Sequence, residues 1–166
     1  EGRTIDDSTA ILRFLDGRLP EERKLYPRGI EDDVLALEER FDEEFGPHIR
    51  RMMYHRILPE RDLAIRLLGT GVPRVERMLL RVAFPGIRAG LRKVLGVHDR
   101  GAERSRVKVE GILDFVTSEL SDGRPYLFGD RFTAADLTFA ALSAPIITPA
   151  NYGIPLPTDG ELPPGL

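Results

Sequence analysis

The chain has 166 residues, of which 42% are hydrophobic and 31% are charged, and its formal net charge is -3. A chain of this length can fold without a disulfide or a metal, and its lack of cysteine excludes a disulfide framework, cysteine-ligated zinc and a cysteine nucleophile within these residues. The charge is uneven, because residues 1–45 carry a net -7, residues 46–108 a net +10 and residues 109–166 a net -6. Prolines and a glycine interrupt the uncharged stretch 137–158, which argues against a membrane-spanning helix there.

The N-terminal part of the chain predicts one short helix followed by a linker. Asp7 and Ser8 precede apolar residues at helical spacing, and Gly17 marks the end of this helix. The stretch 3–5 is the only one whose residues are typical of a strand, and three residues cannot form a sheet alone. Residues 18–29 contain two prolines and many charges without periodicity, so they predict a linker between two units.

The central part of the chain predicts a series of helices. From Ile30 onward apolar residues recur every three or four positions, which predicts a helical face about 25 residues long. Gly46-Pro47 predicts a kink or a break within it. Further helical patterns cover residues 60–68, 73–95 and 103–121, and a bend is expected at Pro85-Gly86.

The strongest local signal is the start of the last predicted helix. Thr133 can cap this helix, and Asp136 can accept a hydrogen bond from the Thr133 backbone N–H, which together make a capping box. Phe132 and Leu137 stand where a hydrophobic staple belongs. From about residue 145 onward, frequent prolines predict an extended tail.

Two groups of residues have the composition of binding surfaces. Tyr54 and His55 follow two methionines, and such a group either lines an apolar substrate pocket or divides between core and surface. Five arginines at helical spacing form either an anion-binding face or a solvated face that pairs with the acidic run 31–44: Arg74, Arg77, Arg81, Arg88 and Arg92. The scarcity of aromatic residues beside them argues against nucleic acid, and the spacing of His48 and His55 argues against a metal site.

Three separated segments together resemble one protein family. Residues 5–12 (IDDSTAIL) are similar to the end of the thioredoxin-like domain of glutathione transferases, where an acidic residue and a serine begin a helix. Residues 25–27 (LYP) resemble the connection between that family's two domains. Residues 129–138 (GDRFTAADLT) resemble the capping box and staple of its all-helical C-terminal domain. The resemblance spans nearly the whole chain and implies an all-α helical bundle, preceded by a short strand–helix remnant of a thioredoxin-like α/β domain.

The resemblance also implies a division into domains and a function. Residues 1–17 would be the end of the thioredoxin-like domain, residues 18–29 the linker, and residues 30–166 the helical domain with its Pro-rich tail. The implied protein is a cytoplasmic glutathione transferase, which directs the thiolate of its co-substrate glutathione at a small electrophile. The alternative is a non-enzymatic, glutathione-transferase-like protein-interaction module.

Site residues follow from the same resemblance. Asp7 and Ser8 are expected to contact glutathione, and Tyr54 and His55 to line the pocket for the electrophile. The family's catalytic Tyr, Ser or Cys has no counterpart here, so no catalytic residue is assigned and this chain alone is expected to be inactive. No metal, nucleic acid or membrane partner is expected. The family implies a homodimer, with residues 30–57 and 73–96 as candidate interface helices.

Overall fold

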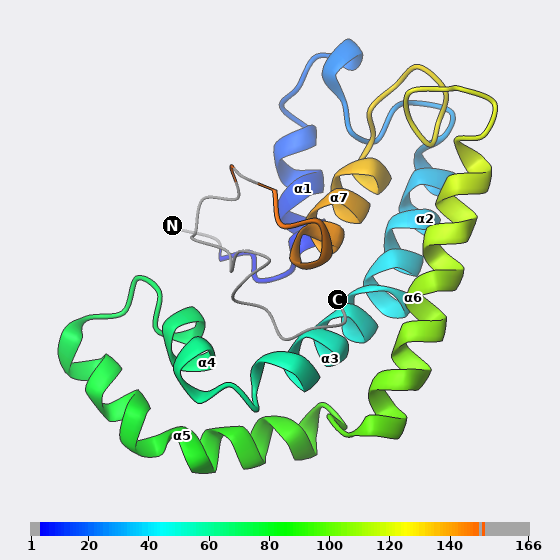
Figure 1. Cartoon of the computed structure of the whole chain (residues 1–166). Coiled ribbons are helices and arrows are strands. Elements are labelled where there is room, and N and C mark those ends of the chain that lie inside the picture. The colour runs from blue at the N-terminus through cyan, green and yellow to red at the C-terminus, as the bar shows by residue number, and fades with distance from the viewer. Residues whose placement is uncertain (1–3, 150, 152–166) are drawn as a thin grey trace.

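The structure is a computed structural model that describes residues 4–149 and residue 151, and it is a bundle of helices (Figure 1). The helices are α1 (Ser8–Asp16), α2 (Glu31–Glu44), α3 (Gly46–Ile57), α4 (Arg61–Leu68), α5 (Arg74–Val94), α6 (Asp99–Glu119) and α7 (Ala134–Ile147), with a 3-10 turn, η1 (Glu21–Arg23), between α1 and α2. The predicted all-α class is therefore confirmed. Among the described residues, no helix combines the length and the apolar character that are needed to cross a membrane.

The first helix begins and ends where the sequence predicts. The Asp7 carboxylate accepts a hydrogen bond from the Ala10 backbone N–H at 2.8 Å, and Gly17 follows the last residue of α1. Thr4 and Ile5, in contrast, do not form the expected strand. A strand needs a neighbour that completes its backbone hydrogen bonds, and the described part of the chain contains no other strand.

The long apolar pattern in the centre of the chain forms two helices, α2 and α3, that meet at Phe45. Pro47 lies in the first turn of α3, where its missing N–H has no helical partner to lose. The neighbouring Gly46 is buried, and a Cβ atom there would lie 3.2 Å from the side chain of Leu142 in α7. The break between α2 and α3 therefore combines a proline that begins a helix with a glycine that allows α7 to approach closely.

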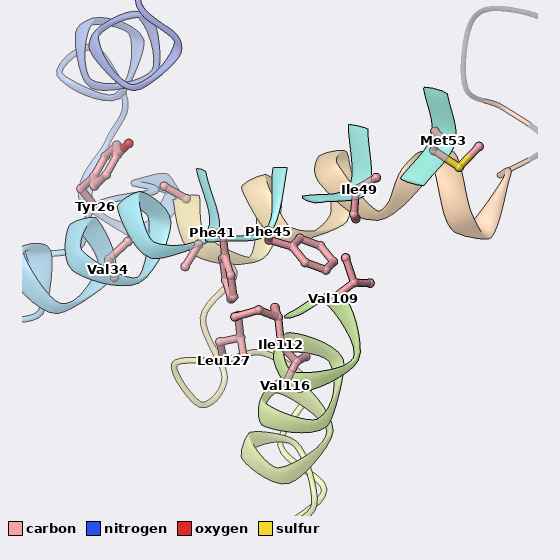
Figure 2. Packing of buried hydrophobic residues seen from close by; sticks show 12 residues of the cluster. Tyr26, Val34, Phe41, Phe45, Ile49, Met53, Val109, Ile112, Val116 and Leu127 are labelled. Atoms are coloured by element: carbon pink, nitrogen blue, oxygen red, sulfur yellow. The ribbon is translucent and has the colours of Figure 1, made fainter. Parts of the chain in front are cut away.

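The main hydrophobic core lies where α2 and α3 pack against α6 and α7. Phe41 and Phe45 are fully buried, and each ring centroid lies 5.4 Å from that of Phe139 in α7. Figure 2 shows Val109 and Ile112 of α6 beside these phenylalanines. The periodic apolar residues of the sequence thus become the faces that meet in one core.

The hairpin of α4 and α5 has a smaller core of its own, made of Leu58, Ala64, Ile65, Phe84 and Val97. Helix α5 continues through Pro85, at the position where the sequence predicts a bend. A proline inside a helix removes one N–H, so the carbonyl four residues earlier loses its partner. That carbonyl belongs to Arg81, and the Arg61 guanidinium donates to it at 3.0 Å.

Two helix ends differ from the sequence prediction. Helix α6 begins at Asp99 rather than near residue 103, because His98 caps it: its Nδ1 accepts a hydrogen bond from the Gly101 backbone N–H at 3.0 Å. Helix α7 passes through Pro145 and ends at Ile147, so the start of the predicted extended tail is helical instead. Most of that predicted tail lies outside the described residues.

The start of α7 confirms the predicted capping box of Thr133 and Asp136. The Asp136 carboxylate accepts three hydrogen bonds, from the Thr133 backbone N–H at 2.9 Å, the Thr133 hydroxyl at 2.8 Å and the Leu127 backbone N–H at 2.9 Å. Phe132, the expected staple residue, packs edge-on against the ring of Tyr126. Asp136 therefore fixes both the helix start and the loop before it.

Replacing Asp136 by alanine should leave three donors at this turn without their acceptor. We expect the free energy of unfolding to fall by about 1–3 kcal/mol, the range for loss of a cap together with buried hydrogen bonds. Urea denaturation of Asp136→Ala measures this, and Asp130→Ala, an exposed neighbour, is the control. Equal stability of the two variants would contradict the structural role of Asp136.

Candidate functional site

The N-terminus of α1 presents two of the predicted site residues. Asp7 lies just before the helix, and Ser8 is its first residue; both side chains are exposed. Asp7 already accepts one hydrogen bond, from Ala10, and its carboxylate has room for more. Within the described residues the Ser8 hydroxyl makes no intramolecular hydrogen bond. The positive end of α1 and a hydroxyl without a partner therefore point into solvent together.

A third residue, Asp42 of α2, lies close enough to Asp7 for their charges to repel. Partial loss of hydration raises the pKa of Asp42, whose side chain is still exposed, and the neighbouring Asp7 carboxylate raises it further. Local sequence patterns do not reveal Asp42 as a site residue, because its proximity to Asp7 joins positions far apart in the chain. Two carboxylates at one place favour a cation between them, so this corner of the molecule attracts positive charge next to the helix N-terminus.

The position of α1 on the helical bundle is set by Glu38 of α2, which is only 1% exposed. Its carboxylate accepts hydrogen bonds from the Thr9 hydroxyl at 3.0 Å and from the Tyr26 hydroxyl at 2.5 Å. Burial, followed by the hydrogen bond to Glu38, raises the pKa of Tyr26 far above its usual value. Tyr26 therefore stays neutral and keeps donating, so Asp7 and Ser8 are held at a fixed place above α2.

Tyr54 and His55, the second predicted pair, border a pocket of about 250 Å³ near the end of α3. Its apolar wall includes Leu58 and Val97. His55 Nε2 lies 2.9 Å from a carboxylate oxygen of Asp99, and this hydrogen bond is the main cause that lowers the pKa of Asp99. Tyr54 and His55 therefore line one hollow, and their contact with a substrate stays a prediction.

The structure does not bring the two predicted pairs together. Asp7 lies near Asp42 of α2, whereas His55 contacts Asp99 at the start of α6. In Figure 1 the helices α1 and α6 lie on opposite sides of α2 and α3. The pair Asp7–Ser8 and the pair Tyr54–His55 thus belong to two separate surfaces of the bundle.

His48 serves packing between α3 and α6. Its Nδ1 lies 3.0 Å from the hydroxyl of the fully buried Ser105 and 3.2 Å from the Arg51 guanidinium. Burial lowers the pKa of His48, and the charges of Arg51 and Lys108 lower it further, so the neutral ring is favoured. Over the residues that the structure describes, no cluster of His, Cys, Asp and Glu has the arrangement of a metal site.

A comparison with known protein families identifies the bundle. The family described as "Glutathione S-transferase, C-terminal domain" matches residues 28–142, which is more than half of the chain. Comparisons with curated proteins and with solved structures found no match. The matched region begins in the linker before α2 and ends within α7, so it contains α2 to α6 entirely. The chain therefore belongs to the glutathione S-transferase C-terminal domain family.

Proposed function

We propose that the protein is a glutathione transferase, in which glutathione is the co-substrate and a small electrophile is the second substrate. Family membership supports this function in general terms. In the proposal, residues 1–17 end a thioredoxin-like domain, residues 18–29 link it to the helical domain of residues 30–166, and the group that activates the glutathione sulfur lies outside this chain. The cytoplasm, where thiols are kept reduced, is the proposed compartment.

The observation that carries the proposal is the arrangement at the start of α1. The γ-glutamyl end of glutathione has a carboxylate and an ammonium group side by side. The free Ser8 hydroxyl and the positive end of α1 suit the carboxylate. The Asp7 and Asp42 carboxylates, which repel each other without a ligand, suit the ammonium. This corner therefore offers a complementary partner for each charge.

The electrophile is proposed to bind in the pocket of Tyr54 and His55. The pocket near the end of α3 joins an apolar wall to polar tips, as a small-molecule site requires. We therefore keep both residues as candidates for substrate contact and assign them no step in the chemistry.

A homodimer is proposed from the outer face of α5, which carries large apolar side chains in contact with solvent. Val75, Met78, Leu79 and Val82 are 59–77% exposed and recur at helical spacing. A continuous exposed apolar stripe on a protein surface marks an interaction site. Two copies related by a two-fold axis bury both stripes at once, and the arginines beside each stripe suit the acidic run 31–44 of the other copy.

The same stripe favours the alternative function, an interaction module without transferase activity. In that case α5 binds a different protein, and the glutathione site at α1 is vestigial. Glutathione binding and conjugation by the complete gene product discriminate the two functions, because only the enzyme requires both.

Ser8→Ala in the complete gene product should weaken glutathione binding without unfolding the protein. We expect the dissociation constant to rise by about tenfold to a hundredfold, the usual effect of one lost hydrogen bond to a charged group. Isothermal titration measures it, together with conjugation of glutathione to a reactive aryl halide. Ser118→Ala on α6 is the control. If neither glutathione binding nor conjugation is detected in the unmodified protein, the transferase proposal fails; unchanged affinity in Ser8→Ala removes Ser8 from the site.

Asp42→Asn should stabilise the protein at neutral pH. The folded state raises the pKa of Asp42 and so binds more protons than the unfolded state, which makes the free energy of unfolding fall as the pH rises through the Asp42 titration. The neutral amide removes that loss. Urea denaturation at mildly acidic and neutral pH measures the difference, with Asp114→Asn on α6 as the control. The same variant should bind glutathione more weakly; a variant that is less stable at neutral pH would contradict the assigned repulsion.

Leu79→Glu should convert the proposed dimer to a monomer. The substitution places a charge in the centre of the exposed apolar stripe, where it loses its hydration on association. The expected result is a halved mass in light scattering with unchanged helical content. Val107→Glu, an exposed apolar position on α6, should leave the mass unchanged. A protein that is monomeric without any substitution would refute the dimer.

A further inference from the structure

The middle of α5 borders a pocket of about 310 Å³, which shares only Arg88 and Arg92 with the pocket of Tyr54 and His55. Its polar lining consists of the arginine side chains Arg61, Arg88 and Arg92, and its apolar lining of Phe84, Pro85 and Ala89. Arg88 and Arg92 are four residues apart on α5, so they lie on the same face, one turn apart. Arg61 is the first residue of α4, and its side chain contacts α5.

Backbone carbonyls hold two of these three arginines in place. The Arg61 guanidinium donates to the Arg81 carbonyl at 3.0 Å, the carbonyl that Pro85 leaves without its helical partner. The Arg92 Nε donates to the Val97 carbonyl at 3.4 Å. A guanidinium has five N–H donors, so each of these arginines keeps several donors for another partner. Arg88 is half-buried and makes no hydrogen bond within the described residues.

The chain offsets the positive charge of the pocket only in part. Within the part of the chain that the structure describes, no carboxylate forms an ion pair with Arg61, Arg88 or Arg92. The Asp99 carboxylate is hydrogen-bonded to His55, the main cause of its lowered pKa, and the charge of Arg92 lowers that pKa further without a direct contact. Three guanidinium groups around one hollow repel each other, and a bound anion relieves this repulsion while accepting hydrogen bonds from their free N–H groups.

We propose that this pocket binds a small organic carboxylate. Its carboxylate accepts hydrogen bonds from Arg88, with Arg61 and Arg92 on either side, because a planar guanidinium matches the two oxygens of a carboxylate. Its apolar body lies against the exposed Pro85 and Ala89. Arg88 and Arg92 also line the pocket of Tyr54 and His55. The same two positive charges therefore act on a ligand in either pocket. This site does not depend on the proposed glutathione chemistry.

A small acid is favoured over a nucleic acid by the shape and lining of the site. A nucleic-acid surface needs a row of cationic groups that follows a phosphate backbone, and exposed aromatic rings for the bases. Here the three arginines converge on one hollow, and the single aromatic residue in its lining, Phe84, is 1% exposed. The apolar wall also favours an organic body over a bare inorganic anion.

Benzoate and benzamide are suitable probes, because they share one ring and differ in charge. By isothermal titration of the chain, we expect benzoate to bind at least about tenfold more tightly than benzamide, the usual gain from a charge-assisted hydrogen bond. Arg88→Gln should remove most of this preference, and Arg88→Lys should remove part of it, since lysine keeps the charge and loses the planar fork. Arg104→Gln, which removes an exposed arginine of α6, is the matched control.

Three results would overturn the proposal. Equal affinity for benzoate and benzamide shows that the arginines do not recognise the carboxylate. An equal loss of benzoate affinity in Arg88→Gln and Arg104→Gln, with both proteins folded by circular dichroism, shows only a general effect of charge. Displacement of benzoate by inorganic phosphate at the same concentration shows that the apolar wall contributes nothing. Glutathione should not displace benzoate, because the two ligands are expected at different sites. This competition experiment therefore distinguishes the pocket at α5 from the site at α1.

Discussion

The buried carboxylate of Glu38 is the interaction on which the arrangement of the N-terminal segment depends. Removing a charged group from water is costly unless hydrogen bonds replace its hydration. Here the replacement comes from two hydroxyls outside α2, on Thr9 and Tyr26. Because Thr9 belongs to α1 and Tyr26 to the linker, satisfying one carboxylate brings three segments together. Displacing either segment would leave one oxygen of that buried carboxylate without its donor.

The linker between α1 and α2 is held more firmly than its composition indicates. Both backbone polar groups of Leu25 are bonded, its N–H to the Asp16 carboxylate and its carbonyl to the N–H of Ala134 at the start of α7. The Arg131 guanidinium also donates to the Glu21 carbonyl. The linker, although rich in charge and proline, is therefore held at fixed contacts. It connects the end of α1 with the start of α7, where the predicted capping box lies.

Local patterns in the sequence predicted the features that depend on neighbouring residues. The apolar spacing of α2 and α3, the break at Gly46-Pro47 and the capping box at Asp136 were all visible, because each is decided within a few positions. Interactions between residues far apart in the chain could not be predicted from such patterns. The unbroken course of α5 through Pro85 involves Arg61, and the raised pKa of Asp42 involves Asp7. For the same reason the sequence does not reveal that the pairs Asp7–Ser8 and Tyr54–His55 lie on different surfaces.

The two hydrophobic cores of the bundle are separate, and Ile57 at the end of α3 is the partly buried residue that packs against both. Regions with their own small core and few contacts to the rest open and close as independent cooperative units. We therefore expect the hairpin of α4 and α5 to open as a unit of its own, with amide protons that exchange with solvent on a different timescale from those of α6. Substitutions inside the hairpin core should then have little effect on the stability of the main core.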